Sequence, residues 1–577
     1  MEINSFGSDD ILSCAQQCSD KIRQTVQFMS LDKNAELDNI LMLSVAVLRQ
    51  ARNQSQPVNR LPPEILTIIF QRIASLVSAI CKSKCGDPCR HRTHDNAVVP
   101  LSHVCRYWRS VALSTPHLWR QIVVRRQSVE LLKTSVERSR NVPLTVELDG
   151  SGWSDDRDWL WQLLQAQRHR IEEIVCKDDE NLSGPSCNMA QCLTFSAPAL
   201  KKLTVAHVWK GFPKAGSLFA GCAPQLRSFC GCDSSHLPRG ITASLTSVHI
   251  SDCTMRLVTL MEWLRSCPQL EHLSLKDAFS NFDSRPLEKG PVRLPRLHRL
   301  YMQSSPSDAE AFFAKVSLPS TTSVQLGVWN TSIDDSENMP SLTHFPLGEP
   351  TQLAFIEHQT NLGLIAADQS RTVFVREVDC VIDTPLPSLI SPDRALTFVR
   401  DIWIIDEGCR ADSRIGSMLH SLRAIPAATS LTIDSGHPRT YLARLTANID
   451  DHNAPLLPAL SSVRICNIRR SKDVLNVIVF AKARAELGFP IASLHISYRP
   501  GYDGPILDRK TALKYVQRIE VDTLGARPDL EFPVDRCSCD ADHEWQPWKS
   551  LWGHMRKPCS SETWPCTVWS GNLPNRQ

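Results

Sequence analysis

The first part of the chain repeats apolar residues with the period of a helix. They recur every three or four positions from Ile11 to Met29 and again from Leu37 to Leu48, and residues 9–52 contain no proline. This spacing gathers the apolar side chains on one face of an α-helix. The pattern predicts two helices, which form either an amphipathic hairpin or short coiled coil, or pack on the module that follows. We expect the second arrangement.

A new helical pattern begins after the polar linker at residues 54–57. Its start contains Pro62 and Pro63, and proline fits only the first turn of a helix, where the amide that it lacks has no partner anyway. Glu64 is favourable beside the positive end of that helix. The residues that follow form a broad apolar stripe, made of Ile65, Leu66, Ile69, Phe70, Ile73, Leu76 and Val77.

Two more short helices follow a loop at residues 81–96. The first contains Val104, Trp108 and Val111 at helical spacing, and the second starts with Thr115 as N-cap and Pro116 at its first position. Three short helices cannot bury this many apolar side chains among themselves, because a module of about 60 residues is only marginally stable alone. The excess apolar surface predicts a protein partner.

From residue 125 to residue 535 a different phrase recurs. A proline is followed by apolar residues two, five and seven positions later. The last two lie on one side of a strand, and the segment between copies returns as a helix, as at Leu257–Cys267 and Val474–Gly488, where Gly488 is the C-cap glycine. Complete copies begin at Pro198, Pro268, Pro295, Pro340 and Pro458, and weaker copies surround Ile174, Phe229, Val248 and Ile519.

These copies are spaced by about 20 to 30 residues, close to the period of leucine-rich repeats. The chain is therefore predicted to be an α/β protein in which N-terminal helices and a three-helix module precede an irregular leucine-rich-repeat-like solenoid. Leu203, Leu273, Leu300 and Val463 should point inward. Residues 348–420 contain no clean copy and form either a distorted part of the array or an insertion. The alternative is an irregular α/β domain with parallel strands.

Composition excludes several classes of function. The 64 basic and 61 acidic residues leave a net charge of +3, without the clustered positive excess that a nucleic-acid surface needs. No apolar run approaches the roughly 18 residues of a membrane span, and the acidic N-terminus predicts no signal peptide. The 21 cysteines are odd in number and scattered. We expect reduced thiols in the cytoplasm or nucleus.

Neither catalysis nor a bound cofactor is predicted. The chain lacks the phosphate-loop, dinucleotide-loop, zinc-hydrolase and nucleophile-elbow motifs. Two Cys/His clusters are weak candidates for zinc, since neither has the paired C-x2-C spacing, and we expect no structural metal. The tail at residues 536–577 is rich in tryptophan, which favours a cap on the open end of the array over a partner-binding segment. The clusters contain Cys81, Cys85, Cys89, His91 and His94, and Cys537, Cys539, His543, Cys559 and Cys566.

The stretches LPPEILTIIF (61–70), VCRYWRSVA (104–112) and TPHLW (115–119) together resemble the F-box, in the form common among F-box-like proteins of mushroom-forming fungi. The segment Leu131–Leu148 resembles the link of that family to its C-terminal domain. The insertion at residues 81–96 departs from the compact pattern of the family. The resulting division is an N-terminal helical segment at 1–56, an F-box-like module at 57–124, the array at 125–535 and the tail at 536–577.

The resemblance implies a non-enzymatic adaptor of an SCF-type cullin–RING ubiquitin ligase. Such an adaptor binds the Skp subunit, and through it the cullin, while the array captures a protein target. The alternatives are a scaffold that uses the array alone and an enzyme within residues 348–536. Trp108 is also a candidate for the core of the module. The residues expected to contact the Skp subunit are Leu61, Pro62, Ile65, Leu66, Ile69 and Phe70, helped by Val104, Trp108, Leu118 and Trp119.

Overall fold

Two compact units make up the chain, Met1–Cys187 and Asn188–Gln577. No helix among the residues described is long and apolar enough to cross a membrane. The computed structural model describes residues 8–83, 98–124, 129–149, 158–177, 193–206, 218–232, 237–238, 240–253, 255–280, 290–328, 344–346, 349–358, 361–368, 372–377, 396–406, 422–447, 455–499, 502, 504 and 507–522.

The first unit begins with the two predicted helices, α1 (Ser8–Thr25) and α2 (Leu31–Ser55), joined by the short 3₁₀ helix η1 (Val26–Phe28). The expectation that they pack on the next module is wrong for α2, which has no buried residue. Its polar links to that module lie at its C-terminal end, where Arg106 Nη1 donates to Gln50 Oε1 at 3.2 Å and Asn59 Nδ2 donates to Asn53 O at 2.6 Å. Most of the large apolar residues of α2 therefore face solvent.

The next module contains the predicted helices, except that the helical spacing around Trp108 is interrupted. Val104 lies in a turn between two short helices, Val98–Ser102 and Arg106–Ser114. Thr115 precedes the last of them, which is a 3₁₀ turn and not an α-helix. The Thr115 hydroxyl does not cap that turn but donates back to Val111 O at 2.8 Å, at the end of the preceding helix. The elements are η2 (Pro57–Arg60), α3 (Pro63–Ser83), α4 (Val98–Ser102), α5 (Arg106–Ser114) and η3 (Pro116–Trp119).

The chain then forms parallel strands that alternate with helices. β1 pairs with β2 and β2 with β3, so that Ile122, Val146 and Ile174 become register partners. All three side chains are buried. The strands are β1 (Gln121–Val124), β2 (Leu144–Asp149) and β3 (Ile171–Lys177), and the helices are α6 (Val129–Arg138) and α7 (Asp158–Gln167).

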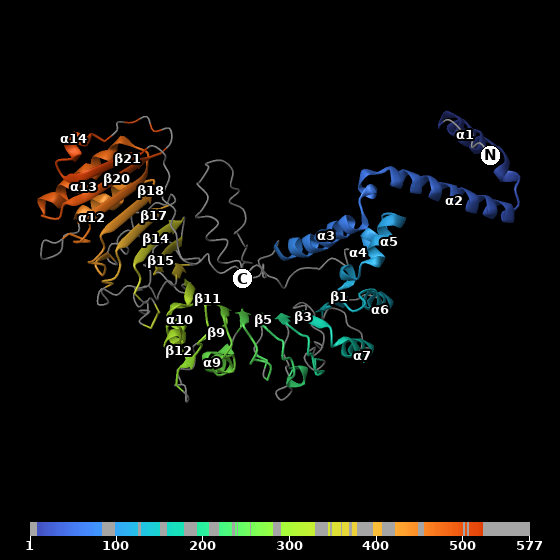
Figure 1. Cartoon of the computed structure of the whole chain (residues 1–577), viewed down its shortest axis with the longest axis horizontal. Coiled ribbons are helices and arrows are strands. Elements are labelled where there is room, and N and C mark those ends of the chain that lie inside the picture. The colour runs from blue at the N-terminus through green and yellow to red at the C-terminus, as the bar shows by residue number, and fades with distance from the viewer. Residues whose placement is uncertain are drawn as a thin grey trace, which may run out of the picture. The chain divides into compact units, whose positions relative to one another are not determined.

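The second unit continues with parallel strands that pair in chain order (Figure 1). These are β4 (Lys202–Ala206), β5 (Ser228–Cys232), β6 (Ser247–Ser251), β8 (His272–Lys276), β11 (Arg299–Ser304) and β13 (Ser323–Val328). Between them lie η4 (Leu218–Gly221), α9 (Leu257–Arg265), α10 (Pro306–Phe313), and the short pairs β7 (Met255–Arg256) with β9 (Phe279–Ser280) and β10 (Val292–Arg293) with β12 (Val316–Ser317).

The region without a clean repeat copy interrupts this order. β14 (Gln352–His358), β15 (Asn361–Ala367) and β16 (Thr372–Glu377) form an antiparallel succession. β16 pairs parallel with β13, and β14 pairs parallel with β17. The three strands thus enter the sheet in reversed chain order.

After this interruption the parallel order resumes. Figure 1 shows α12 and α13 next to each other beside these strands. Helix α13 ends before Gly488, whose φ of +88° fits the predicted C-cap glycine. The elements are β17 (Asp401–Asp406), β18 (Ser430–Ser435), α12 (Pro438–Ala447), β19 (Ser462–Ile468), α13 (Ser471–Glu486), β20 (Ile491–Tyr498), α14 (Arg509–Ala512) and β21 (Val516–Asp522).

The recurring prolines have a common structural role. In four copies the proline is the second residue of a four-residue turn. The backbone N–H of the leucine two positions after the proline donates to the backbone carbonyl of the residue before the proline. The distances are 3.2 Å for Leu200 to Ala197, 3.3 Å for Leu270 to Cys267, 3.2 Å for Leu297 to Leu294 and 3.1 Å for Leu460 to Leu457. The turn sets the start of the strand. The Pro340 copy lies largely outside the residues described.

An apolar ladder forms the core between the strands and their helices. Phe229, Val248, Leu273 and Leu300 are successive register partners, and all are buried. Leu203 and Val463 are buried too, so the predicted inward orientation of the four marker residues is confirmed. The protein is thus a mixed α/β structure with mostly parallel sheets and helices at its N-terminus.

Candidate functional site

The segment that leads into α3 is held by two aromatic residues of α5. The Tyr107 hydroxyl donates to Leu61 O at 2.8 Å, and Trp108 Nε1 donates to Asn59 Oδ1 at 2.6 Å. The Trp108 ring also packs on Phe70, with 4.9 Å between ring centroids. These contacts fix the position of Pro62 at the start of the helix.

A small core joins α3, α4, α5 and η3. Trp119 is buried and donates its indole N–H to Ala112 O at 2.8 Å, while the Arg138 guanidinium lies 4.5 Å from the centre of its ring. Because the indole polar group is paired, burying this large side chain leaves no unsatisfied donor. The core consists of Leu66, Phe70, Val98, Leu101, Val111, Ala112, Leu118 and Trp119.

The same helices leave apolar side chains in solvent. Ile65 is 42% exposed, Ile68 53% and Val104 56%. Ile65 and Ile68 are three residues apart on α3, so they lie on one face of that helix. Exposed large apolar residues beside a complete core mark a surface suited to binding another protein.

The residues predicted for docking thus fall into three groups. Leu66, Phe70, Leu118 and Trp119 are buried in the core, Leu61, Ile69 and Trp108 are half-buried, and Pro62, Ile65 and Val104 are exposed. Their contact with a Skp subunit stays a prediction. The sequence-based selection missed Ile68, although its spacing of three residues from Ile65 signals the shared face.

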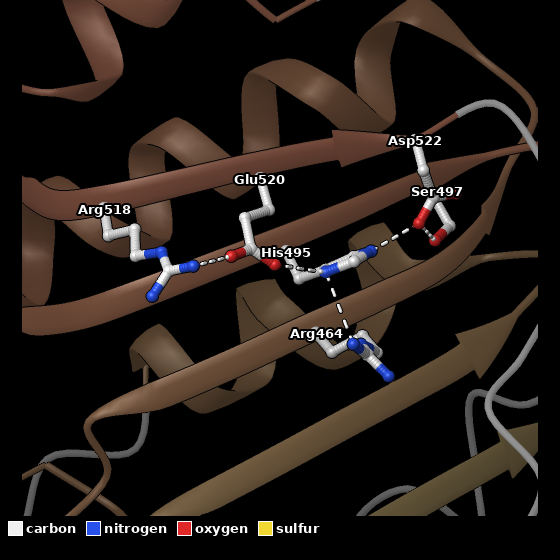
Figure 2. Close-up of polar contacts among 6 residues, drawn as sticks. All are labelled: Arg464, His495, Ser497, Arg518, Glu520 and Asp522. Atoms are coloured by element: carbon white, nitrogen blue, oxygen red, sulfur yellow. Dashed lines mark hydrogen bonds and ion pairs between the residues drawn. The ribbon is translucent and has the colours of Figure 1, made fainter.

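A cluster of polar side chains lies on the sheet face opposite the apolar ladder, on β19, β20 and β21 (Figure 2). His495 Nε2 is bonded to Asp522 Oδ2, which also accepts from Ser497 Oγ at 2.8 Å. His495 Nδ1 lies 3.2 Å from Glu520 Oε2 and 3.3 Å from Arg464 Nη2. A protonated Nδ1 donates to Glu520, and an unprotonated one accepts from Arg464.

The charges of this cluster are largely paired. Arg518 also forms an ion pair with Glu520. The hydrogen bond from His495, followed by the charge of Arg518, holds the pKa of Glu520 below its ordinary value. Ser497 donates to a carboxylate and not to the histidine, so the geometry does not match a nucleophile beside its base.

No group of metal-ligating side chains suited to holding an ion occurs within the described ranges. The Cys/His loop up to His94 and the Cys/Trp tail from Cys537 lie outside those ranges, apart from the backbone at Cys81. The expectation of no metal at those places stays a prediction.

Comparison with known proteins agrees with the geometry of the first site. Residues 58–125 match the F-box-like family. No curated protein matches the chain. The matched segment runs from η2 to the end of β1 and includes every residue predicted for docking. Residues 58–125 are therefore an F-box-like domain.

Proposed function

We propose that this protein is a substrate-recognition adaptor of a cullin–RING ubiquitin ligase of the SCF type. The observation that carries the proposal is the apolar surface that the F-box-like domain leaves exposed after its own core is complete. Burial of a large apolar side chain at an interface contributes about 1.5–3 kcal/mol. A few such residues are enough to hold a Skp-type subunit, and through it the cullin.

The docking contact centres on Pro62, Ile65 and Val104, with Ile68 beside them and Leu61 and Ile69 at the edge. The buried members, Leu66, Phe70, Leu118 and Trp119, act through the shape of the domain because they hold α3 against α5 and η3. Trp108 contributes both to the contact and to the shape of the domain, since its side chain is half-buried and hydrogen-bonded to Asn59.

The remaining chain, residues 125–535, acts in this proposal as a leucine-rich-repeat-like array that captures a protein target. Three features support this assignment: the strands pair in chain order over long stretches, their apolar residues share one register, and the same proline turn starts several of them. The target then contacts the opposite, polar face, where His495 and its neighbours lie (Figure 2). No catalytic residue is assigned.

The test is binding of the full chain to a purified Skp-type subunit, measured by titration calorimetry. The double change Ile65→Asp with Ile68→Asp places two charges on the docking face, and we expect binding to weaken at least about tenfold. Leu513→Asp is the matched control, because Leu513 is 52% exposed but lies outside the domain. Circular dichroism checks that both variants are folded.

Full affinity in the folded double variant would show that the docking assignment is wrong. No binding by the unmodified chain, together with target capture by the same protein, would instead identify a scaffold without ligase attachment.

A further inference from the structure

Helix α2 exposes a continuous run of apolar side chains. The helix is 25 residues long, and none of its residues is buried. Leu43, Val47 and Leu48 are each 66% exposed. The other large apolar residues exposed on the helix are Leu31, Ile40, Leu41, Met42 and Val45.

Such a helix needs a partner in water. Helical stability in proteins comes chiefly from packing of an apolar face, and a helix that is apolar around its circumference is normally buried. The polar contacts of α2 with the F-box-like domain involve its end, at Gln50 and Asn53. The apolar middle of α2 is therefore available to another molecule.

One face of α2 has the spacing of a coiled-coil seam. Leu37, Leu41, Ser44, Leu48 and Ala51 are separated alternately by four and three residues. The Ser44 hydroxyl donates to Ile40 O at 2.9 Å, so its place in a seam leaves no unpaired donor. The small side chains of Ser44 and Ala51 allow a second helix to approach closely.

The distribution of charged residues along α2 indicates which partner helix would be complementary to it. Its first part contains the acids Asp32, Glu36 and Asp38 beside a single Lys33, and its last part contains Arg49 and Arg52. Two copies side by side in the same direction would place acids against acids. Two copies in opposite directions, related by a twofold axis perpendicular to the helices, place the acids of each beside the arginines of the other.

From the seam and the charge pattern together we infer that α2 pairs with α2 of a second copy of this chain, as an antiparallel coiled coil. The pairing makes the protein a homodimer with two F-box-like domains. It uses none of the residues assigned to Skp docking and does not depend on the proposed ligase function.

The test is the mass of the full chain in solution, measured by sedimentation equilibrium. The chain has a mass of 64.7 kDa, and we expect twice that value. Leu41→Glu with Leu48→Glu places charges in the seam and should give the mass of a single chain. Met42→Glu with Leu43→Glu is the matched control, because both residues are exposed on the same helix but lie outside the seam.

A monomeric unmodified chain overturns the inference. So does a control pair that dissociates as fully as the seam pair, since the association would then be non-specific. The α2 residues are not buried, so these changes should leave the circular dichroism of the remaining structure unchanged.

The direction of the pairing is tested by charge reversal. Glu36→Lys with Asp38→Lys, and separately Arg49→Glu with Arg52→Glu, should each weaken self-association several-fold. An equal mixture of these two variants should restore association to the original strength or above it. If neither variant associates more weakly than the unmodified chain, the antiparallel arrangement is wrong.

Discussion

Helix α2 and strands β8 and β11 contain similar leucines in opposite environments. Leu43 of α2 is 66% exposed, whereas Leu273 and Leu300 are completely buried. Leu273 and Leu300 each have a register partner on both sides, because the sheet continues in both directions. No residue of α2 is buried. Apolar content alone therefore does not determine burial.

The largest expected effect is on stability, when a buried leucine of the strands and an exposed leucine of α2 are each replaced by alanine. Leu300→Ala removes a fully buried side chain from the ladder and should lower the free energy of unfolding of the second unit by roughly 2–5 kcal/mol. Leu43→Ala removes an exposed side chain outside the proposed seam and should change stability by less than about 0.5 kcal/mol. Denaturant unfolding followed by circular dichroism measures both. Equal effects would mean that α2 is as well packed as the strands.

A second comparison concerns two buried arginines, one in each unit. Arg170 donates to Val136 O at 3.1 Å and to Val142 O at 3.0 Å. Arg484 donates to Leu456 O and Leu457 O, each at 3.0 Å. Burial lowers the pKa of both, that of Arg484 to about 10, which leaves it charged at neutral pH. In both units a buried arginine thus satisfies backbone carbonyl groups that would otherwise lack a hydrogen-bond donor.

Replacing either arginine by methionine leaves buried carbonyl groups unpaired. We expect each change to lower the free energy of unfolding of its own unit by roughly 1–3 kcal/mol. Lys482→Met is the control, because Lys482 is 51% exposed on the same helix as Arg484 and forms a surface ion pair with Glu486 at 3.6 Å. Separate unfolding transitions of the two units report the effects. An effect of Arg484→Met no larger than that of the control would contradict this role.

The polar face of the strands should give the smallest effect. The folded pKa of Glu520 is below its ordinary value of 4.5, so its contribution to stability is complete above that value and is lost as the pH falls through the folded pKa. Glu520→Gln should therefore lower stability slightly at neutral pH and not at low pH. Unfolding midpoints between pH 6 and pH 3 measure this difference. If the stability difference between the unmodified protein and the Glu520→Gln variant instead increased as the pH fell, the prediction would be wrong.

For the docking residues, local sequence patterns predicted secondary structure but not which side chains are exposed. The proline start of α3 and the helical spacing around Trp108 were sufficient to predict α3 and α5, but not the break at Val104 between α4 and α5. They did not separate Leu66, which is buried, from its neighbour Ile65, which is exposed. The two are adjacent in a wide apolar stripe, and only the position of α5 and η3 decides which side of the stripe is covered.

The order of the strands in the sheet could not be predicted from local sequence patterns. β14, β15 and β16 pair with neighbours in reversed chain order, and no periodicity in residues 348–420 predicts this. Likewise Arg464, His495 and Glu520 are far apart in sequence and meet only because three strands share one register (Figure 2).

What the sequence by itself determined is local: helix starts at prolines, turns at the Pro-x-Leu phrases, and which strand residues face the core. These follow from backbone sterics and from the period of the apolar residues. Only the tertiary structure decided which apolar residues of α2 and α3 stay in solvent, and which polar side chains of β19 to β21 form one cluster. Those outcomes depend on contacts between segments distant in the chain, and a local pattern contains no information about such neighbours.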